Sequence, residues 1–185
     1  MKLKFVTESD LNKFSKNFRS KSTTIRIETI TLKNGVKIRG LIANRDIPKN
    51  VIIAFYPVQI TSKMVDRVVD TSTNDTYTIE IYRILRNNNT RQTDFYGAPT
   101  QKTLRHIDDS LFGVPPIAMF ANEPQKNGKE KENCSLAFPS VFQSDLVEGK
   151  EVYAFLHTIT EIKAGERILW CYGSGYNRNY DTLCD

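Results

Sequence analysis

The stretch ITEIKAGERILWCYG, residues 159–173, decides the fold class. Its middle, residues 163–166, combines a glycine with charged residues and is typical of a turn. The apolar run that follows predicts a strand over residues 167–172. A second polar turn, RDIPKN at residues 45–50, separates predicted strands over residues 36–43 and 51–56. Short strands joined by polar turns predict small antiparallel sheets.

The rest of the chain extends this pattern, and helix is scarce in it. Alternating or apolar runs predict further strands over residues 24–32, 77–84, 134–138 and 151–159. Asn34-Gly35 predicts a hairpin turn, because both central positions of that turn need a positive φ. Short helical segments are predicted over residues 7–18, 62–69 and 115–122, and the polar region up to residue 109 is predicted to be irregular.

Composition indicates one globular domain. The chain has 185 residues, and no apolar run approaches the roughly 18 residues of a membrane span. The first eight residues lack the apolar core of a signal peptide, so we expect an intracellular protein with no membrane partner. The net charge is +5, and many of the basic residues lie in the first forty positions. Without interleaved aromatic residues, a solvated basic face is a better interpretation than direct nucleic-acid binding.

Cysteines and histidines give no sign of a metal site or a disulfide framework. The three cysteines, Cys134, Cys171 and Cys184, are an odd number without CxxC spacing. Cys134 and Cys171 lie in apolar stretches, so we expect both to be small buried hydrophobic residues. His106 and His157 have no ligand-forming residue at a suitable spacing, and no metal is expected.

Three segments, in this order, resemble the SET-domain family. Residues 38–53, IRGLIANRDIPKNVII, resemble the family's opening glycine-x-glycine strand and the turn after it. Residues 118–124, AMFANEP, followed by Asn133-Cys134, are similar to the family's Asn-His-Ser segment with its trailing asparagine. Residues 159–173 match the family's Ile-x-x-Gly-Glu-Glu-Leu strand that ends in Tyr-Gly. The resemblance covers residues 25–180.

The resemblance implies a fold and an activity. The fold would be mainly β, with several small antiparallel sheets, short helices and a threaded C-terminal segment. Residues 23–180 would form the SET domain, residues 1–22 an N-terminal extension and residues 181–185 a tail. The activity would be transfer of a methyl group from S-adenosyl-L-methionine to a lysine of a protein substrate, with histones as one candidate.

The resemblance also assigns roles to individual residues. Tyr172 would place its hydroxyl at the point of methyl transfer. The cofactor would contact Ile38, Arg39, Gly40, Asn122 and Glu123. Tyr77 and Tyr176 would line the channel for the substrate lysine.

Each assignment has a structural alternative. Tyr172 suits an ordinary strand aromatic, Asn122 a helix C-cap, and Arg39 a solvated strand position. Glu123 suits either the adenine amino group or a salt bridge. Tyr176 suits packing of the C-terminal tail together with Tyr180, and Tyr77 an ordinary strand residue.

Two positions depart from the family pattern. Ile38 stands where the family has the first glycine of the cofactor loop, and Glu123 stands where it has histidine. These two residues favour a second interpretation, a catalytically inactive SET-like module that binds a protein or peptide.

Overall fold

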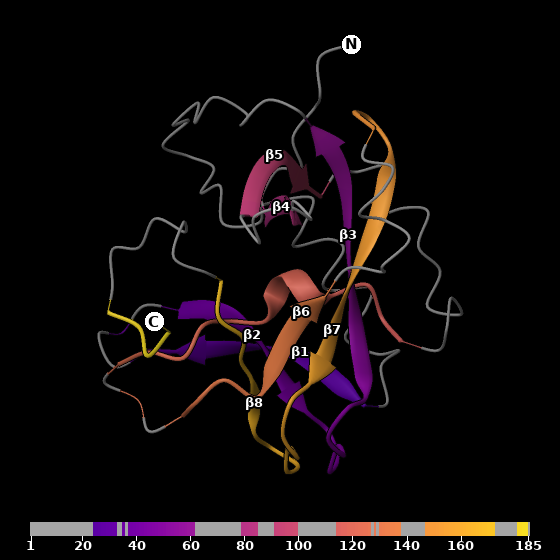
Figure 1. Cartoon of the computed structure of the whole chain (residues 1–185). Helices are drawn as coiled ribbons and strands as arrows, with labels where there is room; N and C mark the ends of the chain where they lie inside the picture. Colours follow the sequence, from indigo (N-terminus) through magenta and orange to yellow (C-terminus); the bar gives the residue numbers. More distant parts are fainter. Residues whose placement is uncertain are drawn as a thin grey trace.

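The computed structural model describes residues 24–32, 35, 37–61, 79–84, 91–99, 114–126, 128, 130–137, 147–172 and 181–184. Within these ranges the chain forms two antiparallel sheets, ordered β1-β2-β8 and β4-β5-β3-β7-β6 (Figure 1). The strands are β1 (Ile25–Thr31), β2 (Lys37–Ala43), β3 (Ile52–Thr61), β4 (Ile79–Ile84), β5 (Arg91–Ala98), β6 (Cys134–Ala137), β7 (Glu151–Thr158) and β8 (Arg167–Ile168). The expected architecture of small antiparallel sheets is confirmed.

The β1–β2 hairpin forms where the sequence predicts it, but Gly35 is not a central residue of a two-residue turn, because its N–H closes a turn that starts at Leu32. The two strands pair in register from Ile25 opposite Ala43 to Thr31 opposite Lys37. Gly35 has a φ of +80° and donates its N–H to the Leu32 carbonyl at 2.9 Å. A positive φ is easily adopted by glycine, which has no Cβ, so Gly35 takes this conformation without strain. This hairpin carries Arg39 and Gly40, two of the predicted site residues.

Strand β3 is longer than predicted, because Pro57 lies inside it rather than ending it. The Phe55 N–H bonds to the Pro115 carbonyl, so this side of the backbone faces away from β7. Strand alternation turns residue 57 the same way, and β5 pairs with β3 only from Gln59 to Thr61. The missing N–H of Pro57 therefore removes no bond from either ladder.

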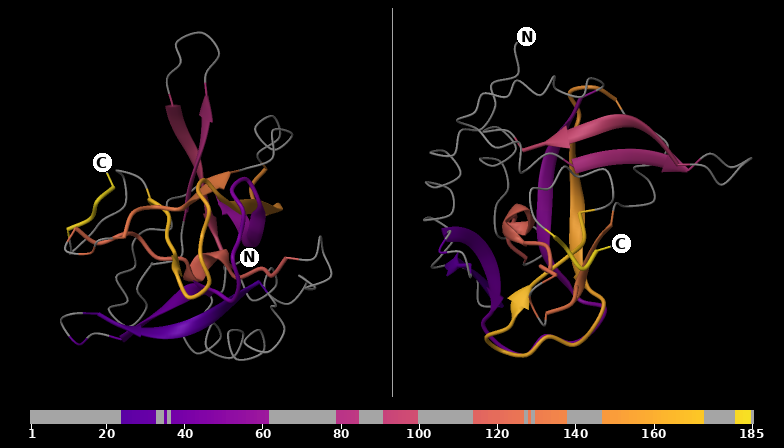
Figure 2. Two further views of the ribbon diagram at one scale, coloured as in Figure 1. Left: turned by 90° about the horizontal axis from the view of Figure 1, so that it is seen from below. Right: turned by 90° about the vertical axis from the view of Figure 1, so that its left-hand side faces the viewer.

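The prediction of an irregular segment was wrong for β5. Residues 91–97 of β5 run along β4, with one register shift, but only the last three residues, from Tyr96 to Ala98, pair with β3. The β4–β5 pair consequently extends away from the rest of the sheet (Figure 2). The sequence of β5 is mostly polar and lacks alternating apolar residues, so the alternation that predicts a strand is absent from it. The helices predicted over residues 7–18 and 62–69 lie outside the described residues.

Among the described residues, one hydrophobic core joins the two sheets. The helix predicted near residues 115–122 is only the 3-10 turn η1 (Ala118–Phe120), which packs against β2 and β3. The buried cluster takes residues from both sheets and from η1, including Leu41, Val58, Phe120 and Leu156. In the described part of the chain, no helix has the length and apolar character needed to cross a membrane.

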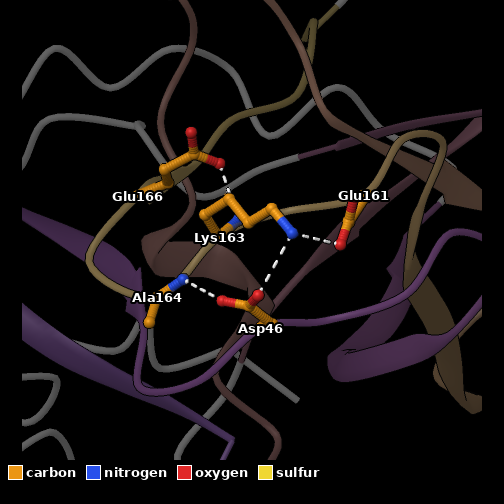
Figure 3. Close-up of polar contacts among 5 residues, drawn as sticks. All are labelled: Asp46, Glu161, Lys163, Ala164 and Glu166. Atoms are coloured by element: carbon orange, nitrogen blue, oxygen red, sulfur yellow. Dashed lines mark hydrogen bonds and ion pairs between the residues drawn. The ribbon is translucent and has the colours of Figure 1, made fainter.

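Two turns far apart in the sequence are fastened to each other. Ile47 and Ile162 exchange backbone hydrogen bonds of 2.8 and 2.9 Å. Beside them, Asp46 accepts the Ala164 N–H at 2.9 Å, and its other oxygen forms an ion pair with Lys163 at 3.1 Å (Figure 3). Lys163 also pairs with Glu161. This contact holds the start of β3 next to the turn that leads into β8.

Candidate functional site

The candidate site is built on the segment that continues β8, residues 169–172. On one side, the Leu169 carbonyl accepts the N–H groups of Asn133 and Cys134, each at 3.0 Å. On the other, the Trp170 N–H donates to the Asn122 carbonyl at 3.0 Å. The segment therefore passes between two stretches of chain and is bonded to both. The predicted strand over residues 167–172 is regular only at its first two residues, and these bonds replace the rest of the ladder.

Tyr172 is held at three points. Its hydroxyl donates to the Ala121 carbonyl at 2.8 Å, and its backbone N–H donates to Glu123 Oε1 at 2.7 Å. Its ring lies against Trp170, with ring centroids 4.9 Å apart. The expected closeness of Tyr172 and Asn122 is confirmed, since Ala121 and Glu123 are the two neighbours of Asn122. These contacts fix both the backbone and the ring of Tyr172.

Asn122 joins this segment to the β1–β2 hairpin. Its Nδ2 donates to the Arg39 carbonyl at 3.0 Å. Its Oδ1 is buried and accepts no hydrogen bond from any residue that the structure describes. The helix C-cap alternative is wrong, because η1 ends at Phe120 with Ala121 as its cap and Asn122 pairs with Leu169.

The contact between Asn122 and the β1–β2 hairpin requires glycine at position 40. A Cβ at position 40 would lie 2.5 Å from Asn122 Oδ1 and 2.2 Å from Ile30 Cδ1, both too close for a real contact. The absent side chain therefore lets Asn122 approach β2. Ile38 is half-buried and pairs with Ile30 across the hairpin.

Arg39 lies over an aromatic ring rather than in open solvent. Its guanidinium carbon is 4.7 Å from the centroid of Phe120, within the range of a cation–π contact. The alternative of a solvated strand position is therefore wrong for this side chain, which is half-buried.

Glu123 is a buried carboxylate, 3% exposed. One contact of this carboxylate is the hydrogen bond that its Oε1 accepts from the Tyr172 N–H at 2.7 Å. A buried acceptor that fixes a backbone N–H orders the chain around it. Glu123 is therefore positioned to set the path of the backbone at Tyr172.

Five other residues singled out in the sequence remain, and the structure describes only one of them. Tyr77, Tyr176, Tyr180 and His106 lie outside the described residues. His157 is a half-buried residue of β7, opposite Ile52 and Ser135. Among the described residues, no group of three or more His, Cys, Asp or Glu side chains is placed to hold a metal ion.

The cysteine prediction needs a correction. Cys134 is buried and free, as expected, and burial raises the pKa of its thiol to about 12, so it stays a neutral thiol. Cys171 instead forms a disulfide with Cys184, 13 positions away. The odd cysteine count gave no signal for this pair, because the pairing depends on the path of the chain and not on spacing.

Comparison with known proteins supports the fold. No protein-family model matches the sequence, and no curated protein matches it. Among solved structures, CpSET8 from Cryptosporidium aligns over 95% of this chain and 84% of its own, with 14% identity and a TM-score of 0.51. ATXR5 in complex with mono-methylated histone H3.1 aligns over 97% and 72%, with 18% identity and a TM-score of 0.49. The methyltransferase domain of human PR domain-containing protein 2 aligns over 97% and 95%, with 12% identity and a TM-score of 0.47.

The protein therefore has the SET-domain fold. At these identities the likeness concerns the fold alone.

Proposed function

We propose that this protein is an S-adenosyl-L-methionine-dependent protein-lysine N-methyltransferase. The observation that carries the proposal is the meeting of Tyr172, Asn122 and the Arg39–Gly40 backbone. Tyr172 bonds across 51 positions to Ala121, and Asn122 across 83 positions to Arg39. A fold that brings these residues together fixes a phenol hydroxyl and an amide side chain in one neighbourhood, as a positioned transfer reaction requires.

The residues present fit a cofactor that carries amine and adenine N–H groups. Asn122 Oδ1 is a buried acceptor that the described part of the protein leaves unused, and such an atom is costly unless it finds a donor. Ile38, Arg39, Gly40, Asn122 and Glu123 are the residues that would hold S-adenosyl-L-methionine. When bound, that molecule supplies an electrophilic methyl group on a sulfonium.

The chain's own contribution is alignment and control of charge. The lysine must present a neutral nitrogen, which costs about 4–5 kcal/mol at pH 7 given an ordinary pKa near 10.4. Burial beside the rings of Trp170 and Tyr172 lowers that cost, because an apolar setting disfavours the ammonium. The Tyr172 hydroxyl donates a hydrogen bond to the Ala121 carbonyl, and this bond fixes the place from which the hydroxyl would orient the amine.

The substrate in this proposal is a protein with an exposed lysine. Tyr77 and Tyr176 are the proposed channel residues, and histones are the first substrates to test. An intracellular location, without a membrane partner and without direct nucleic-acid binding, belongs to the same proposal.

A second candidate is a catalytically inactive SET-like module that binds a protein or peptide. The observation that favours it is that the protein itself uses several of the polar groups of the site and fills the space beside Gly40. Glu123 holds the Tyr172 N–H, Asn122 Nδ2 holds the Arg39 carbonyl, and Ile30 with Asn122 fills the space beside Gly40.

Calorimetric titration with S-adenosyl-L-methionine separates the two candidates. We expect the wild type to bind and Asn122→Ala to bind more weakly by about 1–3 kcal/mol, the cost of an unmet buried polar partner. Asn133→Ala is the matched control. The Asn133 side chain also bonds to this segment, but on its other side, where Asn133 Oδ1 accepts the Leu169 N–H at 2.9 Å. The variant therefore removes a similar hydrogen bond away from the proposed pocket. No binding by the folded wild type would establish the inactive module, and equal loss in both variants would show that the pocket lies elsewhere.

A further inference from the structure

The C-terminal segment, residues 181–184, is fastened beside the stretch that follows Glu123. Residues 124–126 and 181–183 form a short antiparallel contact through backbone and hydroxyl groups. Its bonds run from the Lys126 N–H to the Asp181 carbonyl at 3.1 Å, from the Leu183 N–H to the Pro124 carbonyl at 3.2 Å, and from the Thr182 hydroxyl to the Pro124 carbonyl at 2.8 Å. The segment thus lies against the chain that also anchors Tyr172.

The Cys171–Cys184 disulfide links the C-terminal segment, residues 181–184, to the residue before Tyr172. Cys171 directly precedes Tyr172, and Cys184 directly follows the residues bonded to Pro124 and Lys126. Both cysteines are half-buried, so each residue keeps part of its surface in contact with solvent. Cys134, in contrast, is fully buried, and its neutral thiol is a poor nucleophile for internal exchange.

We propose that the Cys171–Cys184 bond is a reversible modification site that exchanges with dithiols, and that its redox state sets how firmly residues 181–184 and Tyr172 are held. One thiolate of the dithiol attacks a sulfur of the bond, forming a mixed disulfide and releasing the other cysteine as a thiolate. The second thiol of the reagent then displaces the remaining cysteine. Two electrons pass from the dithiol to the protein disulfide, which leaves two cysteine thiols and an oxidised, cyclic reagent.

Two observations make this bond suited to such a role. The hydrogen bonds between residues 124–126 and 181–183 use backbone and hydroxyl groups and no cysteine sulfur, so we expect reduction to loosen the segment and to leave the sheets folded. Closing a loop of 13 residues favours the held arrangement by about 10²-fold in the chain-entropy model. If the protein is intracellular, as its sequence predicts, the bond meets reducing thiols, and disulfides there are usually transient or regulatory.

Hydrogen exchange of backbone amides, in the full chain with and without dithiothreitol, tests the proposal. We expect reduction to speed exchange of the Lys126 and Leu183 amides by up to about 10²-fold and to speed that of Tyr172 as well. The Ile47 amide, bonded to Ile162 at the other pair of turns, is the internal reference and should not change. Because no cofactor or substrate is added, the result is independent of whether the protein is a methyltransferase.

Two variants keep the outcome decisive. Cys184→Ser should reproduce the reduced pattern without reductant, while Cys134→Ala should exchange like the oxidised wild type. Equal exchange of these amides in the oxidised and reduced protein would overturn the proposal. So would alkylation of all three cysteines in the unreduced, unfolded chain, since it would show that the bond does not form.

Discussion

The Tyr172 hydroxyl is the group on which the proposed chemistry depends most. It donates to the Ala121 carbonyl, so Tyr172→Phe removes one preorganised polar contact and keeps the ring against Trp170. We expect turnover of radiolabelled methyl into histones or basic peptides to fall by about 10²-fold or more. Binding of S-adenosyl-L-methionine should change little. Tyr153→Phe on β7 is the matched control and should retain full turnover, and equal turnover of Tyr172→Phe would remove the hydroxyl from the mechanism.

Glu123 gives a sharper test of how the site is held. Glu123→Gln keeps an oxygen that can accept the Tyr172 N–H, whereas Glu123→Ala leaves that N–H unmet. We expect Glu123→Ala to lower the free energy of unfolding by about 1–3 kcal/mol and Glu123→Gln by clearly less. Urea unfolding followed by circular dichroism measures both. If Gln costs as much as Ala, the charge of Glu123 matters more than its hydrogen bond.

At the scale of elements, the contact between the two turns predicts a pH dependence. The Ala164 N–H and then Lys163 lower the pKa of Asp46 from its ordinary value of 3.8. The resulting stabilisation is complete above pH 3.8 and is lost as the pH falls through the lowered pKa. Asp46→Asn should therefore be less stable than the wild type at pH 7, and the difference should shrink below pH 3.8. Urea titrations from pH 2 to 7 measure this, and a constant difference would contradict it.

Lys163, the partner of Asp46, predicts a loss of stability at high pH. Hydrogen bonds from Lys163 to Glu161 and then to Asp46 raise the pKa of Lys163 above 10.5. That stabilisation is present below pH 10.5 and is lost as the pH rises through the raised pKa. The side chains of Asp46, Glu161 and Lys163 are exposed. Added salt should therefore weaken the pH dependence of the stability at both the acid and the alkaline end.

Several elements could be predicted from the sequence, and the reason is local. The place of the β1–β2 hairpin could be predicted from the alternation of its strands and from a glycine between them, Gly35, and both signals are encoded within a few residues. Strand β5 was missed because its stability comes from pairing with β4 and β3, not from apolar residues of its own. The Cys171–Cys184 pair and the Glu123 hydrogen bond were missed because they depend on where distant segments meet. The closeness of Tyr172 and Asn122 could be expected only from the family resemblance.

At the scale of the whole molecule, one core joins the described sheets, so they should unfold together. Buried residues of β1, β2, β3, η1, β7 and β8 belong to one cluster that also contains Trp170. We expect Trp170 fluorescence, which reports on the site, and far-ultraviolet circular dichroism, which reports on the sheets, to give coincident urea transitions. Because Trp170 is the single tryptophan of the chain, the assignment of the signal is unambiguous. A separate, earlier fluorescence transition would show that the site unfolds on its own.

The passage of residues 169–172 between Asn122 and Asn133 has a consequence for the order of events in folding. The segment can complete its bonds only after both flanking stretches are in place, and its contacts close long loops whose entropy cost comes first. The site should then form after the rate-limiting step, with little of its structure present in the transition state. Stopped-flow kinetics of Glu123→Ala should show faster unfolding and an almost unchanged folding rate. In that case, the lifetime of the assembled site is set mainly by the rate at which residues 169–172 leave their place between the two flanking stretches.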